Sequence, residues 1–270
     1  VDAARKDAAR ESAGEFLRDR SSIRARTLWL RINGVGDRHF AADVAAAVRA
    51  QVDGIVLPKP RSARDVLALA AQLDVLETQM NRPLGATTIL PIATETASSV
   101  LGLREYANCG PRLAALTWGA EDLSAALGAE TAVDERGAWL PPYELARSLC
   151  LLAAGAAEVP AIDTVHTDVR DLAGLRRSAL AAHRDGFAGK LAIHPDQVPL
   201  LNEAFRPTAA AVEAAQAIVT AFAAAGGAGV VASGGKMLDR PHLLRAQRVL
   251  ALAAASDAVE PAEGNDFPIG

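Results

Sequence analysis

The sequence predicts an α/β fold built on a parallel sheet, and more specifically a TIM-type (β/α)8 barrel. Short apolar runs typical of strands alternate with helical stretches as far as Pro195, and this alternation indicates βαβ units. The run at residues 55–57 is wholly apolar, as expected of a parallel strand covered on both faces. Polar residues follow five or six successive runs instead of gathering at one switch point, which favours a barrel over a doubly wound sheet.

Six strand–helix units can be read from the periodicity. A closed barrel needs eight such units, so we expect the first two to precede Val1 and the chain to open with a helix over residues 1–19. The predicted strands are residues 27–32, 54–57, 88–92, 114–118, 161–165 and 190–193, and the helices between them are residues 40–51, 62–80, 97–107, 143–156 and 169–185.

The pattern changes after the sixth strand, which leads us to divide the chain between residues 206 and 207. Residues 1–206 form the predicted barrel core, and residues 207–270 form a predicted C-terminal helical arm or lid. Helices are expected at residues 196–205, 208–225 and 240–254, with a glycine-rich link over residues 225–230.

Composition bounds the class of protein. The 270 residues are half hydrophobic and carry a net charge of −4, so a large core is expected and a nucleic-acid partner is not. No apolar run approaches the length of a membrane span and no signal-peptide pattern opens the chain, so we expect no membrane partner. Cys109 and Cys150 lack metal-ligand spacing, and thiols in a reducing, cytoplasmic compartment are expected.

Two acids form the candidate metal site. Glu95 and Asp122 each follow the end of a predicted strand, and the carboxyl ends of parallel barrel strands meet at one mouth. Two carboxylates leave several coordination positions for water and substrate, which is how proteins hold Mg²⁺. Glu121 is a rival ligand, and both acids could instead interact with helix dipoles as structural residues.

Two basic residues follow neighbouring strands. Arg31 ends the first predicted strand, where its guanidinium could clamp a carboxylate or an oxyanion; an ion pair with a strand-end acid is the structural alternative. Lys59 lies between two prolines. It could meet a phosphate or thioester oxygen, although a solvated loop cation is the interpretation we slightly favour.

Three further polar residues have a functional and a structural interpretation each. Asp163 lies within an apolar strand and therefore needs a partner, for which Arg31 or Lys190 is expected, or a place at the mouth. His194 ends the last strand and is either an acid/base group or a structural hydrogen-bonding residue. Asp239, in the arm, completes the active site or caps the last helix.

Taken in order, these segments resemble the citrate lyase β-subunit-like branch of the HpcH/HpaI aldolase superfamily, over the chain from Val1 to about Ala254. The segments that carry the resemblance are Arg31-Ile-Asn-Gly34, Leu57-Pro-Lys59, Ile92-Ala-Thr-Glu-Thr96, Trp118-Gly-Ala-Glu-Asp-Leu123, Ala161-Ile-Asp-Thr164, Gly186-Phe-Ala-Gly-Lys-Leu-Ala-Ile-His-Pro195 and Gly235-Lys-Met-Leu-Asp239.

The resemblance implies a (β/α)8 barrel, usually trimeric, that acts on 3-hydroxy-acyl thioesters with Mg²⁺. It implies Glu95 and Asp122 as metal ligands, Glu95 also lying beside the substrate, and Arg31 as a catalytic residue that grips the substrate. Asp239 falls where related enzymes place an acid that reaches a neighbouring subunit's site. Family members open with a Val-Pro-Gly-type loop and an Asp-Leu-Glu-Asp segment, which would lie upstream of Val1.

The predicted function is a Mg²⁺-dependent carbon–carbon lyase that cleaves a citryl-, citramalyl- or malyl-CoA-type thioester into an acyl thioester and a 2-oxo acid. The thioester is carried by CoA or by an acyl-carrier protein. Three alternatives stay open: an acyl-CoA thioesterase of the same fold, an aldolase on free 2-oxo acids, and a non-catalytic carrier-binding subunit of a lyase complex.

Overall fold

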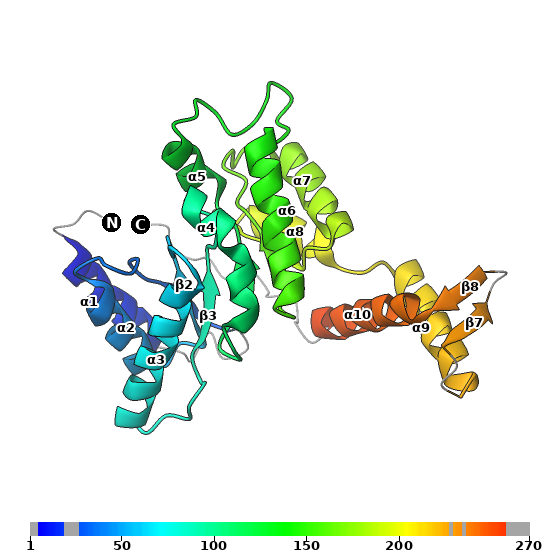
Figure 1. The fold of residues 1–270 in the computed structure, drawn as a ribbon, viewed down its shortest axis with the longest axis horizontal. Coiled ribbons are helices and arrows are strands. Elements are labelled where there is room, and N and C mark those ends of the chain that lie inside the picture. The colour runs from blue at the N-terminus through cyan, green and yellow to red at the C-terminus, as the bar shows by residue number, and fades with distance from the viewer. Residues whose placement is uncertain (1–4, 19–26, 227–228, 234–235, 258–270) are drawn as a thin grey trace. The chain divides into compact units, whose positions relative to one another are not determined.

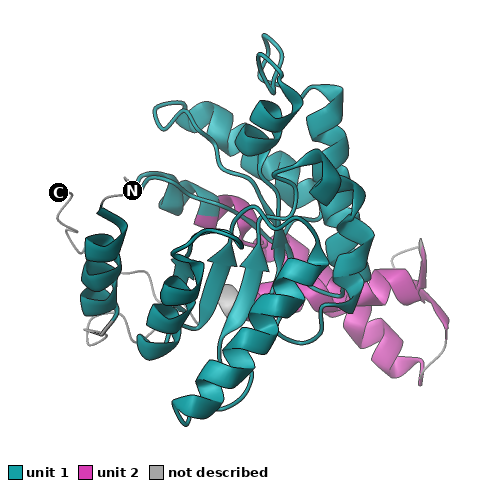
Figure 2. Ribbon diagram, turned by 60° about the vertical axis from the view of Figure 1, so that its left-hand side comes forward, with its two compact units in different colours: residues 1–201 teal, residues 202–270 magenta. Residues whose placement is uncertain are grey.

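The computed structural model describes residues 5–18, 27–226, 229–233 and 236–257. Two compact units divide the chain, residues 1–201 and residues 202–270 (Figure 2). The expected boundary between residues 206 and 207 is five residues further along the chain. Parts of the predicted opening helix, Gly235 of the arm and the tail after Asp257 lie outside the described residues.

The first unit contains the six predicted strands, all parallel and paired in chain order. Hydrogen bonds join β1, β2 and β3 in one ladder and β4, β5 and β6 in another. Parallel bridges from Ile89 to Leu113 and from Ile92 to Thr117 connect the two ladders. This sequential order is that of a barrel and differs from the reversed order of a doubly wound sheet. The strands are β1 (Trp29–Arg31), β2 (Gly54–Leu57), β3 (Thr88–Pro91), β4 (Leu116–Thr117), β5 (Ala161–Asp163) and β6 (Gly189–Lys190).

Helices connect the strands and cover the outer face of the sheet (Figure 1). Of these, α3 contacts β3, α6 contacts β4 and β5, and α7 contacts β6. The strands β3, β4 and β5 are accordingly mostly buried. The helices of this unit are α1 (Lys6–Arg18), α2 (Phe40–Arg49), α3 (Ala63–Gln79), α4 (Ala97–Leu101), the 3₁₀ helix Leu103–Asn108, α5 (Ala120–Leu127), α6 (Pro141–Ala156) and α7 (Leu172–Asp185), and α8 (Gln197–Phe205) crosses into the second unit.

Two local features differ from the predicted elements. Helix α5 was not among the predicted helices, because its N-cap is Gly119, a residue with no side chain to signal a helix start. The helix predicted over residues 97–107 is interrupted at Gly102, where α4 ends and the 3₁₀ helix begins.

The second unit is a helical hairpin with a small antiparallel ribbon. Helices α9 (Ala209–Ala224) and α10 (Arg240–Asp257) contact each other, and strands β7 (Val230–Ser233) and β8 (Lys236–Asp239) pair between them. The ribbon was not predicted, because the neighbouring glycines indicated only a link. The apolar core of the second unit contains Phe222, Val231 and Leu238.

One stretch, Gln197–Ala224, has the length and hydropathy of a membrane span. It is not one helix, since α8 ends at Phe205 and α9 begins at Ala209. Neither helix alone reaches the ~20 residues that a span requires.

Candidate active site

Glu95 is a buried acid just beyond the end of β3. Its side chain is held in place by the backbone N–H of Lys59, which donates to Oε2. The residue as a whole is 4% exposed. Gly119 leaves room for it, because a Cβ at that position would lie 3.1 Å from Cγ of Glu95. The ends of β2, β3 and β4 thus converge on one carboxyl group.

Asp122 reaches the same place from the first turn of α5. Its Oδ1 lies 2.8 Å from Nζ of Lys59, and its carboxylate shares a hydrogen bond with the Glu95 carboxyl group. Glu121, the rival ligand, is exposed to solvent. Of the two adjacent acids, the structure therefore brings Asp122 to Glu95.

Burial and the hydrogen bond with Asp122 raise the pKa of Glu95 to about 7. The same hydrogen bond lowers the pKa of Asp122, as does the ammonium of Lys59. Below about pH 7, Glu95 therefore holds a proton that it donates to Asp122.

Lys59 contributes to the site through its backbone and its side chain. Its φ of +50° is in the left-handed region, an unfavourable conformation for a residue other than glycine, and the main-chain N–H donates to Glu95. The ion pair with Asp122 raises the pKa of Lys59. The side chain is 57% exposed, as the solvated loop cation favoured from sequence implies, and it also pairs with Asp122.

Arg31 lies at the end of β1 on the wall of a cavity of about 710 Å³. Lys59, Asn33 and one side of α1 also line this cavity. The positive charge of Arg31 offsets a small part of the rise in the pKa of Glu95, and it adds to the lowering of the pKa of Asp122. Lys59 therefore connects this cavity to the acid pair, because it lines the cavity and also contacts Glu95 and Asp122.

Asp163 belongs to a buried network on the neighbouring strands. Its carboxylate accepts from Nζ of Lys190 at 3.0 Å, from Nε of Arg147 at 3.1 Å and from Nε1 of Trp118 at 2.7 Å. The predicted pairing with Lys190 is confirmed. Sequence reasoning missed Arg147 and Trp118, for which the only signal was that a buried acid needs several donors.

Two other candidates have local partners. His194 is hydrogen-bonded by the backbone N–H of Asp196 at 3.3 Å, the structural role weighed from sequence. Asp239 belongs to the second unit, where its carboxylate contacts Nδ1 of His242 in the first turn of α10, and this contact lowers its pKa. The structure thus gives Asp239 a helix-start contact, and its part in catalysis stays a prediction.

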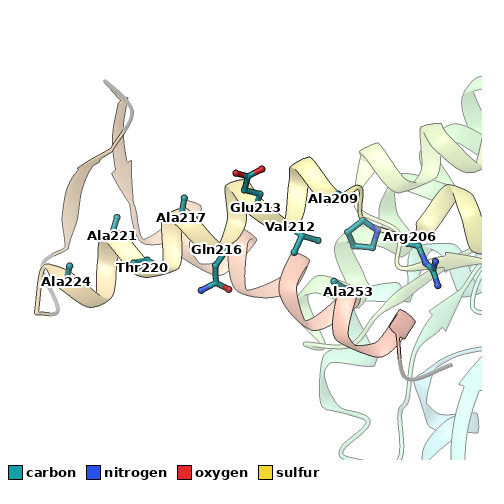
Figure 3. Close-up of a pocket in the computed structure, with 11 residues that line it drawn as sticks. Arg206, Ala209, Val212, Glu213, Gln216, Ala217, Thr220, Ala221, Ala224 and Ala253 are labelled. Carbon is teal, nitrogen blue, oxygen red and sulfur yellow. The ribbon is translucent and has the colours of Figure 1, made fainter. Parts of the chain in front are cut away.

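A second, larger cavity of about 1030 Å³ lies in the second unit along α9 (Figure 3). Most of its lining is alanine and other small side chains, with Glu213 and Arg206 as its charged members. Neither Glu95 nor Asp122 belongs to this unit, so the cavity along α9 is separate from the acid pair.

Among the described residues, no group of three or more His, Cys, Asp and Glu side chains could hold a metal ion. Glu95 and Asp122 form a pair, and two hard oxygen ligands suit Mg²⁺, which keeps several waters or substrate oxygens when bound to protein. The oxygen ligands of the acid pair therefore fit Mg²⁺.

Comparison with known proteins agrees with this geometry. Residues 1–195 match the HpcH/HpaI aldolase/citrate lyase family, and residues 149–256 match carbon–carbon bond lyases of the TIM-barrel fold. The chain is thus a carbon–carbon lyase of the TIM-barrel class, as predicted. It belongs to the HpcH/HpaI aldolase/citrate lyase family.

Relatives cover most of the chain. The citrate lyase subunit β of Leuconostoc mesenteroides subsp. cremoris is 35% identical over 98% of this chain and 86% of its own. A (3S)-malyl-CoA thioesterase of Cereibacter sphaeroides is 34% identical over 84% of this chain and 74% of its own.

Solved structures share the fold. CitE of Mycobacterium tuberculosis, in complex with magnesium, acetoacetate and coenzyme A, has a TM-score of 0.72 and 31% identity, covering 94% of this chain and 86% of that one. A citrate lyase of Burkholderia xenovorans LB400 has a TM-score of 0.81 at 23% identity, covering 96% of this chain and 82% of that one. The latter shows the fold alone, and the predicted barrel class is confirmed.

Proposed function

We propose that the protein is a Mg²⁺-dependent lyase that cleaves a 3-hydroxy-acyl thioester of the citryl-, citramalyl- or malyl-CoA type into an acyl thioester and a 2-oxo acid. The observation that carries the proposal is the pair formed by Glu95 and Asp122 at the strand ends, which Lys59 joins: its backbone N–H donates to Glu95 and its ammonium lies 2.8 Å from Oδ1 of Asp122. The CitE complex with magnesium and coenzyme A supports it.

Glu95 and Asp122 are the residues that would hold the ion. When bound, Mg²⁺ polarises the oxygens of the 2-oxo-acid half and stabilises the negative charge that develops there. Glu95 must lose its proton for this, and the neighbouring charge of Arg31 favours that loss. The ion pair between Lys59 and Asp122 must weaken when the ion binds, because the Lys59 ammonium contacts Oδ1 of Asp122.

Arg31 acts on the substrate. Its guanidinium donates to the oxygen that becomes negative as the substrate hydroxyl passes its proton to the Asp239 carboxylate or to water. The bond between the carbinol carbon and the α-carbon of the thioester then breaks, and the carbinol carbon becomes the carbonyl of the 2-oxo acid. The electron pair passes to the thioester as an enolate, which takes a proton at its α-carbon from Asp239 or water to give the acyl thioester.

The role of Asp239 depends on assembly. We propose a homotrimer in which the arm, residues 207–270, brings Asp239 to the site of a neighbouring subunit. Light scattering of the purified protein would give a mass three times that of one chain, whereas a monomer with full activity would contradict this part of the proposal.

A thioesterase is the second candidate, because the malyl-CoA thioesterase is about as similar to this chain as the lyase subunits are. Water would then attack the thioester carbonyl, and the products would be free CoA and the hydroxy acid. Two alternatives have less support: an aldolase on free 2-oxo acids, and a subunit that binds a carrier without turnover.

One assay separates these functions. The purified protein is incubated with malyl-, citramalyl- and citryl-CoA, with Mg²⁺ or with EDTA, and the products are identified by mass spectrometry. The lyase yields an acyl-CoA and a 2-oxo acid only with Mg²⁺. Free CoA with intact hydroxy acid would indicate the thioesterase, and no turnover of any thioester would contradict both.

A further inference from the structure

Thr94 connects the two strand ends that carry the acids. Its side chain is fully buried, and its Oγ1 accepts from the backbone N–H of Gly119 at 3.0 Å. The same hydroxyl lies 3.4 Å from the Gly119 carbonyl oxygen. Thr94 directly precedes Glu95, and Gly119 is the N-cap of the helix that carries Asp122.

This contact replaces a hydrogen bond that Asp122 would otherwise be placed to make. In a capping box, the side chain at the third helical position accepts from the N–H of the N-cap residue. Asp122 occupies that third position of α5, and Gly119 is the N-cap. Because Thr94 already accepts from the Gly119 N–H, the Asp122 carboxylate is left for Lys59 and Glu95.

The neighbouring helix shows the alternative arrangement. At the start of α4, Thr96 is the N-cap and Ser99 the third helical residue, and the two form a complete capping box within the helix. Both side chains are used there for the helix itself. In α5 the cap comes from the preceding strand end instead, so the acid at the third position remains available.

We infer that Thr94 is a positioning residue for the metal site: by accepting from the Gly119 N–H, it keeps the Asp122 carboxylate turned toward Glu95. The inference rests on the proposed metal site. Without the hydroxyl, the Gly119 N–H loses its acceptor and Asp122 is the carboxylate placed to supply one. Asp122 would then cap α5 at the expense of the ion.

The test measures Mn²⁺ and Mg²⁺ affinity by calorimetry for the wild type and for Thr94→Val, Thr94→Ser and Thr117→Val. Thr117 is the matched control, since it is a buried threonine of β4 whose hydroxyl has no hydrogen-bond partner among the described residues. We expect Thr94→Val to weaken metal binding about 10- to 100-fold, the usual effect of removing a group that orients a ligand. Thr94→Ser should restore affinity to within about twofold, and Thr117→Val should bind as the wild type does, because neither change removes a hydrogen bond made by the side chain.

Wild-type affinity in a folded Thr94→Val protein would overturn the inference while leaving the metal site intact. If the wild type binds no divalent cation, or binds it equally well after Glu95→Gln, the metal site itself fails and the inference with it. Should Thr94→Val not fold, Thr94→Cys takes its place, because a thiol is a weak acceptor. Wild-type affinity in Thr94→Cys would again overturn the inference.

Discussion

The Lys59 ammonium lies 2.8 Å from Oδ1 of Asp122, so that a side-chain cation is bound to one of the two proposed metal ligands. The ammonium and a divalent ion therefore compete for Asp122 and repel each other. Two unit charges about 4 Å apart in water interact by about 1 kcal/mol, and screening by salt offsets part of the increase due to the double charge of the ion.

Replacing Lys59 by methionine should accordingly tighten Mg²⁺ binding about fivefold, the equivalent of about 1 kcal/mol. Titration calorimetry would measure the change. Arg64→Met is a suitable control, because Arg64 is an exposed basic residue in the first turn of α3, the helix that follows the Lys59 loop. Weaker Mg²⁺ binding after Lys59→Met would show that the lysine supports the ion instead of competing with it.

The acid pair itself is tested by isosteric amides. Glu95→Gln and Asp122→Asn should each lower kcat by about 1000-fold, because the several kcal/mol of charge stabilisation attributed to the ion depend on both ligands. Steady-state kinetics at saturating Mg²⁺ would measure this. Glu121→Gln alters an exposed acid next to Asp122 and should leave kcat within about twofold of wild type; a comparable loss there would mean that the ligand is misassigned.

Metal affinity should depend on pH. Since the pKa of Glu95 is raised to about 7, the proton must leave before the ion binds, and affinity should fall about tenfold for each pH unit below 7 and level off above it. Calorimetry at pH 5.5, 6.5, 7.5 and 8.5 would follow this, with up to one proton released per ion at the acidic end. Equal affinities at pH 5.5 and 7.5 would contradict the shared proton.

The raised pKa also has a consequence for stability. Between the ordinary pKa of a glutamate and about 7, the folded protein without metal holds a proton that the unfolded chain has lost. Its free energy of unfolding should therefore decrease as pH rises through this window. The lowered pKa of Asp122 acts only below the ordinary pKa of an aspartate, outside this window. Glu95→Gln should remove this dependence in urea titrations without metal, and an unchanged slope would locate the proton elsewhere.

Asp163 should be essential for stability. Its removal leaves Lys190, whose side chain is 2% exposed, and Arg147 without their shared carboxylate. Loss of one partner from a buried ion pair costs about 3 to 5 kcal/mol, and denaturant titration of Asp163→Ala should show a loss in that range. Asp185→Ala removes a more exposed partner of Arg147 and should cost less than ~1 kcal/mol; equal losses would argue against the buried network.

Much of the barrel and its acid pair could be predicted from sequence, for a physical reason. Strands covered on both faces are apolar, so a carboxylate directly after one stands out, and parallel strands bring such residues to one mouth. Glu95 and Asp122 were found in this way. The partner of Asp163 followed from the need of a buried acid for a cation.

The remaining features depend on contacts that leave no periodic signal. The left-handed backbone at Lys59 directs a main-chain N–H to Glu95. The prolines on either side of Lys59 do not predict this conformation. Thr94 caps a helix 25 residues further along the chain, a distance beyond any local capping pattern. The ribbon of β7 and β8 was missed because nearby glycines indicate a link as readily as a turn.

The central claim is that Glu95 and Asp122 together bind one divalent cation. The most direct measurement is anomalous diffraction at the manganese edge from crystals grown with Mn²⁺. A single peak within bonding distance of one oxygen of each acid, absent from Glu95→Gln crystals, is the result that we predict. A map without that peak at saturating Mn²⁺, or with the ion bound away from both carboxylates, would contradict the account.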